Sequence, residues 1–336
     1  MINFPTNEAI PLPPQGSWPE SVHRFDTRSA NALNAALAAQ RPLLVRGNPG
    51  TGKSQLARAA AQYLNRLFVT EVVHAKAESH DLQYHFDAVG RLGEAQALGA
   101  ACRTGEEREK EVRECLEPKR FLAPGALWWI FNWETAWKQS AFTRFKHRKP
   151  EKPPGWEPAK GSVLLIDEID KADADLPNGL LETLGNGGFT VPYCDDPVRV
   201  QEGMKKPLVI ITTNEERELP DAFVRRCLVL HLYLPDEDPK NREQPEGVRQ
   251  QALTDYLMQR GKDHFSDLAD EVLQEAAVQL WADRNDARRQ GLTPPGMAEY
   301  IDLLRAVREL GSNAKEQLSL LGDIKEFVLK KHLELL

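Results

Sequence analysis

Short apolar runs alternate with longer amphipathic segments along the first two thirds of the chain. Four of these runs are rich in aliphatic and β-branched residues on both faces, which is typical of strands buried in a parallel sheet. They lie at residues 42–45, 67–73, 162–166 and 207–214. Helical periodicity follows or precedes each of them, so the pattern predicts an α/β arrangement.

Other elements follow from local signals. Residues 26–40 predict a helix with Asp26 or Thr27 as its N-cap, and residues 176–185 predict another that ends at glycines. Residues 188–200 predict a short hairpin. From Pro235 onward the periodicity is helical almost throughout, with breaks expected at three places: Gly261, residues 294–296 and Gly311.

The chain therefore divides into three predicted parts. Residues 1–24, polar and proline-rich, are expected to form an irregular arm. Residues 25–234 are expected to form an α/β nucleotide-binding domain with an insert at about 74–160, and residues 235–336 a small all-α lid domain.

A glycine-rich segment, GNPGTGKS, joins the first predicted strand to a helical pattern. It matches G-x-x-x-x-G-K-[ST] in the strand–loop–helix context that this motif requires. Glycines let backbone N–H groups surround phosphates at a helix N-terminus, the lysine reaches the β- and γ-phosphates, and the hydroxyl of Ser54 ligates Mg²⁺. We predict that the nucleotide, ATP, is bound by Gly47, Asn48, Pro49, Gly50, Thr51, Gly52, Lys53 and Ser54.

Two carboxylates follow the strand at residues 162–166, in VLLIDEID. Ligands of α/β proteins bind at the carboxyl ends of strands, so Asp167 is predicted to hold Mg²⁺ and Glu168 to orient and polarise the attacking water. Asp170 and Asp173, a few residues on, are interpreted as a helix cap and surface charges.

The segment VIITTNEERELPDAFVRRC carries the last candidate residues. Its strand ends at Asn214, whose amide is suited to bridging the γ-phosphate and the attacking water. Arg225 and Arg226 are adjacent cations of the kind that stabilise transition-state charge from a neighbouring subunit. The alternative for the two arginines is a surface pair or a salt bridge.

Composition narrows the class of protein. The chain has 336 residues, and its net charge of −7 argues against a general nucleic-acid binder. It has no apolar run near the roughly 20 residues of a membrane span and no signal-peptide core, so a cytoplasmic protein without membrane contact is expected. The four cysteines lack metal-ligand spacing and suit a reducing compartment: Cys102, Cys115, Cys194 and Cys227.

Five of the seven tryptophans fall between residues 128 and 156. Trp129, Trp133 and Trp137 recur at helical spacing, which predicts one helix face. That face is expected to pack on the sheet or a neighbouring subunit; the alternative is a surface for a partner or a pore. A basic stretch follows, and it suits a solvated loop better than a single-stranded nucleic-acid site: Lys146, Arg148, Lys149 and Lys152.

These motifs, in this order, resemble those of AAA+ ATPases, and DLQYHFDAVGRLGEAQ, LAPGALWW, DLPNGLLETLGNGGFTVP and LPDAFVRR resemble the MoxR branch. The resemblance covers about residues 25–310. It implies a homo-oligomeric ring, commonly a hexamer, with Asn214 as the sensor and Arg226 as the trans-acting finger, Arg225 being its partner. It also implies a chaperone-like remodeller that works with proteins carrying von Willebrand factor A domains.

One feature departs from this family. Its members usually place a lysine or arginine that senses nucleotide in a stretch similar to GLTPPGMAEYIDLL, where this chain has Leu292 and Thr293. Arg288 and Arg289, just upstream, are the candidate substitutes.

Three hypotheses result. The first is a Mg-ATP-dependent MoxR-type ATPase that remodels a protein client or partner complex. The second is a nucleic-acid-directed motor or loader of a restriction or defence system, supported only by the basic, aromatic-flanked stretch and the shared AAA+ core. The third is a nucleotide switch with low turnover, which is compatible with Thr293 in place of the lid cation.

Overall fold

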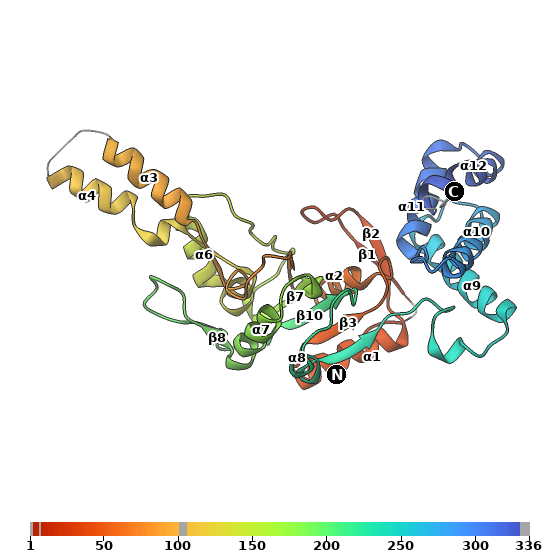
Figure 1. Cartoon of the computed structure of the whole chain (residues 1–336), viewed down its shortest axis with the longest axis horizontal. Coiled ribbons are helices and arrows are strands. Elements are labelled where there is room, and N and C mark those ends of the chain that lie inside the picture. The colour runs from red at the N-terminus through yellow and green to blue at the C-terminus, as the bar shows by residue number, and fades with distance from the viewer. Residues whose placement is uncertain (1–2, 7, 101–105, 330–336) are drawn as a thin grey trace. The chain divides into compact units, whose positions relative to one another are not determined.

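The computed structural model describes residues 3–6, 8–100 and 106–329 of the chain. They form two compact units, which are coloured by position along the chain in Figure 1. The sheet unit comprises residues 35–44 and 60–229, and the helical unit comprises residues 1–34, 45–59 and 230–336. The domain boundaries predicted from the sequence remain a prediction.

A five-stranded sheet forms the centre of the α/β fold, and all five strands contribute residues to the sheet unit. Its strand order is β11-β3-β10-β7-β4. β7 pairs in parallel with both neighbours, Val163 lying opposite Leu208 of β10 and opposite Phe68 of β4. The strands are β3 (Leu43–Arg46), β4 (Leu67–Val72), β7 (Ser162–Asp167), β10 (Leu208–Thr213) and β11 (Leu228–His231).

This sheet confirms the four strands expected from apolar runs and adds β11. β7 and β10 are buried along almost their whole length, as side chains covered on both faces of a parallel sheet must be. The helices of the α/β fold are α1 (Thr27–Ala39), α2 (Lys53–Leu64), α7 (Asp175–Asn186) and α8 (Asp221–Arg226). The expected hairpin is β8 (Gly188–Phe189) with β9 (Val198–Arg199), directly after α7 and its left-handed C-cap, Gly187.

The expected insert lies between β4 and β7. It contains an antiparallel pair, β5 and β6, and two helices without buried residues, α3 and α4, which run side by side in Figure 1. α5, by contrast, is buried at every position. The bounds are β5 (Tyr84–Phe86), α3 (Ala88–Ala100), α4 (Glu106–Cys115), β6 (Leu122–Pro124), α5 (Ala126–Phe131) and α6 (Trp133–Phe142).

The expectation of one helix through Trp129, Trp133 and Trp137 is wrong. Asn132 has extended backbone angles that end α5, and its side chain then accepts a hydrogen bond from the Thr135 N–H at 3.1 Å, which caps α6. The rings nevertheless remain in contact: the ring centroids of Trp129 and Trp133 are 4.9 Å apart, and those of Trp133 and Trp137 are 5.7 Å apart. The first two tryptophans are buried in the sheet-unit core, as the packing interpretation requires, whereas Trp137 is 48% exposed.

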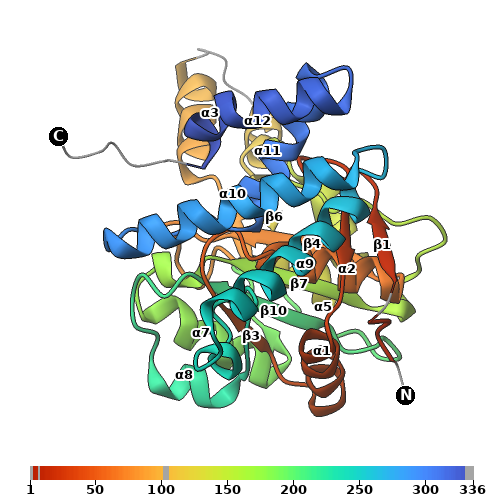
Figure 2. The ribbon, with the colours of Figure 1, turned by 90° about the vertical axis from the view of Figure 1, so that its right-hand side faces the viewer.

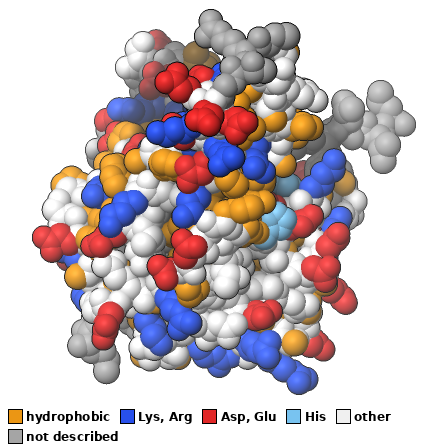
Figure 3. All heavy atoms as spheres, turned by 90° about the vertical axis from the view of Figure 1, so that its left-hand side faces the viewer, with side chains coloured by type: hydrophobic (Ala, Val, Ile, Leu, Met, Phe, Trp, Pro, Cys, Tyr) orange, Lys and Arg blue, Asp and Glu red, His pale blue; other side chains and the backbone are white. Residues whose placement is uncertain are grey.

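Two residues of the basic stretch contact these rings. The ammonium groups of Lys149 and Lys152 lie 5.6 and 5.4 Å from the centroid of Trp137, and Lys152 is also 5.0 Å from that of Trp133. These are cation–π distances, so both cations have partners within the chain. The space-filling view of one face in Figure 3 shows hydrophobic and basic side chains lying among one another.

The arm over residues 1–24 is not irregular, as the sequence suggested. β1 (Ala9–Leu12) and β2 (Ser21–Arg24) pair as an antiparallel hairpin in the helical unit. Pro11 lies in β1 opposite Val22. A strand tolerates proline at a position where the backbone nitrogen does not have to donate a hydrogen bond to the neighbouring strand. The guanidinium of Arg24 anchors the hairpin by donating to the Asp263 carboxylate at 2.6 and 2.8 Å.

The helical unit also contains the C-terminal helices α9 to α12, which are labelled in Figure 2. They share an apolar core that includes Leu257, Leu273, Tyr300 and Leu304. Their bounds are α9 (Glu246–His264), α10 (Asp270–Arg289), α11 (Met297–Leu310) and α12 (Ala314–Val328). Short 3₁₀ turns elsewhere in the chain are η1 (Pro118–Phe121), η2 (Pro158–Lys160), η3 (Ile169–Lys171) and η4 (Pro239–Asn241).

The helix breaks expected at residues 294–296 and at Gly311 are confirmed, but the break at Gly261 is wrong. Gly261 lies inside α9, where a Cβ would come within 2.9 Å of the Tyr300 hydroxyl, so the glycine allows α9 to pack closely on α11. Cys115, Cys194 and Cys227 carry free thiols, and Cys102 lies outside the described residues. Among the described helices, none is long and apolar enough to cross a membrane.

The cap of α1 yields a stability prediction. The Asp26 carboxylate accepts hydrogen bonds from the Ser29 N–H at 2.7 Å and the Ser29 hydroxyl at 3.0 Å. Asp26→Ala removes this acceptor and should lower the free energy of unfolding by about 1 kcal/mol in a urea titration. Asp26→Asn, which retains a side-chain oxygen, is the control; equal losses in both variants would contradict a capping role.

Candidate functional site

The glycine-rich segment forms the loop between β3 and α2. Gly47, Gly50 and Gly52 have φ angles of 149°, 76° and 87°, a region that residues with a Cβ rarely adopt. A Cβ added at Gly52 would meet nothing within 4 Å, so conformation rather than crowding explains that glycine, and its backbone is accessible. The loop thus has the positive φ angles that let successive backbone N–H groups approach phosphate oxygens, and it is uncrowded at Gly52.

Lys53 and Ser54 follow the loop in the first turn of α2. The Lys53 ammonium is buried inside the loop and donates to the carbonyls of Gly47 at 2.7 Å and Asn48 at 2.9 Å. The Thr51 hydroxyl closes the turn by donating to the Asn48 carbonyl at 2.8 Å. The residues present therefore fit a triphosphate: a cation, a hydroxyl and the positive end of a 12-residue helix lie at one loop.

The start of α11 lies against this loop. The Ala298 N–H donates to the Gly50 carbonyl at 3.3 Å, and a Cβ at Gly296 would lie 3.1 Å from the Pro49 carbonyl oxygen. Glu299 in turn accepts from the Gly296 N–H at 2.8 Å. The segment GLTPPGMAEYIDLL, which has Leu292 and Thr293 at the places of the expected lid cation, thus leads directly to the phosphate loop.

The candidate substitutes for the lid cation have other partners. Arg288 forms ion pairs with Asp236 and Glu237, and Arg289 lies 3.5 Å from the Asp286 carboxylate. Whether either arginine senses nucleotide stays a prediction.

In the sheet unit, Asp167 is the last residue of β7 and Glu168 follows with φ 59° and ψ 50°. A left-handed conformation is uncommon for a residue with a Cβ and costs roughly 1 kcal/mol, so neighbouring contacts must enforce it. Thr212 of β10 supplies them: its hydroxyl donates to the Asp167 carboxylate and accepts from the Glu168 N–H at 2.9 Å.

Both oxygens of the Glu168 carboxylate are engaged. The Asn214 side-chain amide donates to Oε1 at 3.2 Å, and the Lys171 ammonium forms an ion pair with Oε2. The hydrogen bond to Glu168 raises the pKa of Lys171 above its usual value, so the ammonium stays charged at neutral pH. The structure therefore brings the predicted base and the predicted sensor within hydrogen-bond distance.

Asp170 was misread from the sequence as a cap or a surface charge. Its side chain is buried and accepts from the backbone N–H groups of Asn214 at 3.4 Å and Glu216 at 2.9 Å. It therefore fixes the loop that carries Asn214. Asp173 is exposed, as expected, and lies 3.3 Å from Arg217.

Sequence reasoning missed Thr212, Asp170 and Lys171. The signal for Thr212 was available, since two threonines end an otherwise aliphatic strand, and buried hydroxyls need partners. No comparable signal marked the other two residues.

Arg225 and Arg226 end α8 with exposed side chains. Their carbonyls accept hydrogen bonds from the Arg41 guanidinium, which holds this end of the helix in place. Among the described residues neither guanidinium has a hydrogen-bond or ion-pair partner, so both cations are available to another molecule.

A glycine-rich phosphate loop between a strand and a helix, with an acidic strand end and a polar amide on the adjacent strand, defines a P-loop nucleotide-binding protein. Residues 42–227 match the model of the AAA domain, dynein-related subfamily. The chain belongs to this AAA family, whose domains bind and hydrolyse nucleotides.

Similar solved structures include three of RuvB from Thermotoga maritima: two point mutants and the Holliday junction branch migration motor. Each shares 14% identity with the chain, with TM-scores of 0.41, 0.43 and 0.41. The alignments cover 88–89% of this chain and 67–68% of theirs. No curated protein sequence matches the chain.

The buried Asp170 carboxylate should contribute both to stability and to ATP turnover. Asp170→Ala leaves two backbone donors without their acceptor, so it should lower the free energy of unfolding by roughly 2 kcal/mol. Because the loop that carries Asn214 loosens, ATP turnover should fall by up to about 30-fold, the factor that corresponds to a loss of roughly 2 kcal/mol in the transition state. Nucleotide affinity should change little, since the phosphate loop is not touched.

Denaturant titration, ATPase rates and nucleotide titration measure these three quantities. Asp173→Ala, an exposed carboxylate three residues away, is the matched control and should behave as wild type in all of them. Equal behaviour of the two variants would show that Asp170 does not position the loop.

Proposed function

We propose that the chain is a Mg-ATP-dependent ATPase of the MoxR type, which forms a ring and remodels a protein client or partner complex in the cytoplasm. The observation that supports hydrolysis most directly is the 3.2 Å hydrogen bond between Asn214 and Glu168, which come from the ends of adjacent strands. A carboxylate and a neutral amide placed this way can share one water molecule.

Each predicted site residue has a role in this proposal. Residues Gly47 to Ser54 bind the triphosphate through backbone N–H groups and the Lys53 ammonium. Ser54 and Asp167 would hold Mg²⁺, which, when bound, neutralises charge on the phosphates. Thr212 supports this role, because its hydroxyl donates to one Asp167 oxygen and so fixes the orientation of that carboxylate.

Glu168 is proposed to accept a proton from the attacking water, and Asn214 to hold that water beside the γ-phosphate. In the structure the Glu168 carboxylate is occupied by Lys171 and Asn214. For catalysis it must therefore exchange at least one of these contacts for the water. The Lys171 ion pair, whose side chains are partly exposed to solvent, is the contact proposed to break.

Ring formation is supported by the two exposed arginines at the end of α8. Arg226 is proposed to act on the nucleotide of a neighbouring subunit, with Arg225 beside it. The hexamer and a partner with a von Willebrand factor A domain come from the MoxR resemblance. The exposed helices α3 and α4 of the insert offer surface for a partner.

A mixing experiment tests the shared site. Glu168→Gln removes the base, and Arg226→Ala removes the cation that the neighbour would receive, so each homogeneous protein should lose at least 100-fold in ATP turnover. Mixing the two should restore measurable activity, because some interfaces then pair an intact Glu168 with an intact Arg226. Phosphate release is measured at several mixing ratios.

Arg113→Ala, an exposed arginine of α4, serves as the control and should keep full activity. Wild-type turnover that does not depend on protein concentration down to the monomer would contradict a site completed by a neighbour. If no mixing ratio restores ATP turnover, a site completed by a neighbour is contradicted as well.

The client is tested by capture from the native lysate. Glu168→Gln in saturating Mg-ATP should retain the assembled, target-bound state, so partners that co-purify are identified by mass spectrometry with and without nuclease. A protein partner that resists nuclease, above all one with a von Willebrand factor A domain, is expected. Recovery of nucleic acid, with proteins lost after nuclease, would favour the nucleic-acid motor instead.

A further inference from the structure

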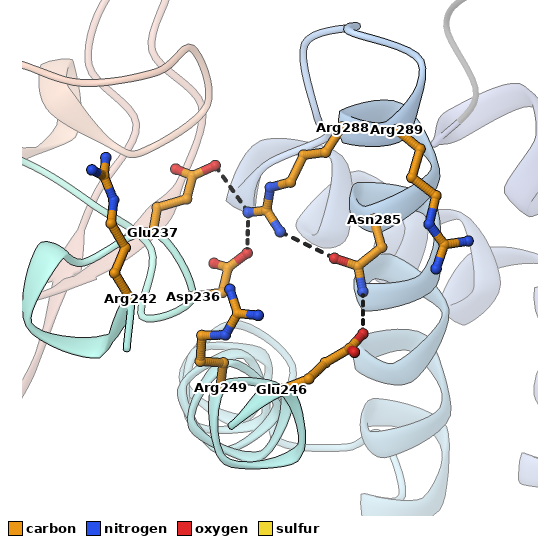
Figure 4. A pocket seen from close by; sticks show the side chains of 8 residues that line it. All are labelled: Asp236, Glu237, Arg242, Glu246, Arg249, Asn285, Arg288 and Arg289. Atoms are coloured by element: carbon orange, nitrogen blue, oxygen red, sulfur yellow. Dashed lines mark hydrogen bonds and ion pairs between the residues drawn. The ribbon is translucent and has the colours of Figure 1, made fainter. Parts of the chain in front are cut away.

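A pocket of about 490 Å³ lies within the helical unit, beside the linker that follows β11. Its lining comes from this linker, from the start of α9 and from the end of α10, and Figure 4 shows the side chains that line it. All of them are polar, and half are arginines: Arg242, Arg249, Arg288 and Arg289. A pocket of this volume suits a small molecule, but it lacks the apolar wall that a base or a hydrophobic ligand needs.

The carboxylates on one side of the pocket are already neutralised. Asp236 and Glu237 accept from Arg284 at 2.9 and 2.7 Å, and Arg288 pairs with both of them. Arg284 and Asp236 are buried, so this two-by-two network is part of the structure rather than a surface contact. It contributes no net charge.

The remaining cations are not neutralised to the same degree. Arg242 and Arg249 have no ion pair with a carboxylate among the described residues, and Arg249 has a buried Nε without a hydrogen-bond partner. Arg289 has only a long, exposed contact of 3.5 Å with Asp286. Glu246, the one other acidic residue of the lining, lies 3.5 Å from the Asn285 amide.

The pocket thus has excess positive charge, although residues 235–336 as a whole carry 20 acidic and only 14 basic residues. Three of the arginines that line the pocket lack a strong ion pair, and guanidinium pairs bidentately with phosphate oxygens. Glu246 is also the first residue of the 19-residue helix α9, so the positive end of that helix dipole lies at the same wall.

We infer that this pocket is a second anion site, distinct from the phosphate loop, which binds a compact phosphate-bearing anion such as pyrophosphate through Arg242, Arg249 and Arg289. The inference does not require ATP hydrolysis by the chain.

The pocket wall also touches the phosphate loop. Glu237, whose Oε1 faces Arg284 and Arg288, accepts with its Oε2 from the Asn48 side-chain amide at 3.1 Å. An anion that attracts the arginines shifts the charges around Glu237, and so occupation of this site should alter nucleotide affinity at the phosphate loop. Because the phosphate loop also binds phosphate groups, the test separates binding at these two sites.

The experiment is isothermal titration of the full chain with pyrophosphate at low salt. It uses Lys53→Ala, which removes the phosphate-loop cation, so that binding at the second site is seen alone. One pyrophosphate per chain should bind to this variant, and affinity should fall with added salt. The triple variant Arg242→Gln, Arg249→Gln, Arg289→Gln, made in the Lys53→Ala chain, should bind at least tenfold more weakly.

The matched control is Arg305→Gln, because Arg305 pairs with Asp302 one helical turn away, as Arg289 does with Asp286. It should leave pyrophosphate binding unchanged. Binding that is lost in Lys53→Ala alone would assign the anion to the phosphate loop and overturn the inference. Equal binding by the triple variant would overturn it too.

Circular dichroism melts verify that the variants fold. If the triple variant unfolds, Arg242→Gln alone replaces it, since Arg242 is exposed and lies outside the α9–α12 core, and a loss of at least threefold is then expected. Unchanged binding by a folded Arg242→Gln would overturn the inference.

Discussion

The parallel pairing of β7 with β10 is the constraint on which the candidate site depends. Ile166 lies opposite Ile211, so the next residues along the two strands, Asp167 and Thr212, come together at the carboxyl edge. The Thr212 hydroxyl then connects the Asp167 carboxylate to the Glu168 backbone N–H. A one-residue shift in register would turn each of these side chains to the other face of the sheet and separate them.

This arrangement also explains the left-handed backbone at Glu168. The strand could continue in an extended conformation, but its N–H would then leave the Thr212 hydroxyl. The local cost of roughly 1 kcal/mol is offset by a hydrogen bond that is largely shielded from water. The result is that the carboxylate turns toward Lys171 and Asn214 instead of following the strand.

Much of the fold was predictable because its signals are local. Buried strands read as apolar runs, and the phosphate loop, the acidic strand end and Asn214 each follow directly from such a run. The features that sequence reasoning missed depend on tertiary contacts. Gly261 lies inside α9, where the absence of a Cβ leaves room for the Tyr300 hydroxyl. Asn132 ends one helix and caps the next, so the regularly spaced tryptophans do not lie on a single helix.

The burial of charged side chains depends on tertiary contacts in the same way. Asp170 and Asp173 are chemically identical and three residues apart, yet one is buried beneath a loop and the other is solvated. Nothing in the spacing tells them apart, since the difference lies in which backbone N–H groups the fold brings near. Likewise, nothing in the sequence distinguishes Arg284 from the other charged positions of its helix.

In the structure Arg284 is buried and satisfies two carboxylates of the linker that follows β11. A buried pair of this kind is costly to break, because removing one partner leaves the other charge without compensation. The network therefore holds the linker on α10 and places Glu237 where it meets Asn48 of the phosphate loop. Through that contact, the charge state of the arginine pocket and the conformation of the loop become linked.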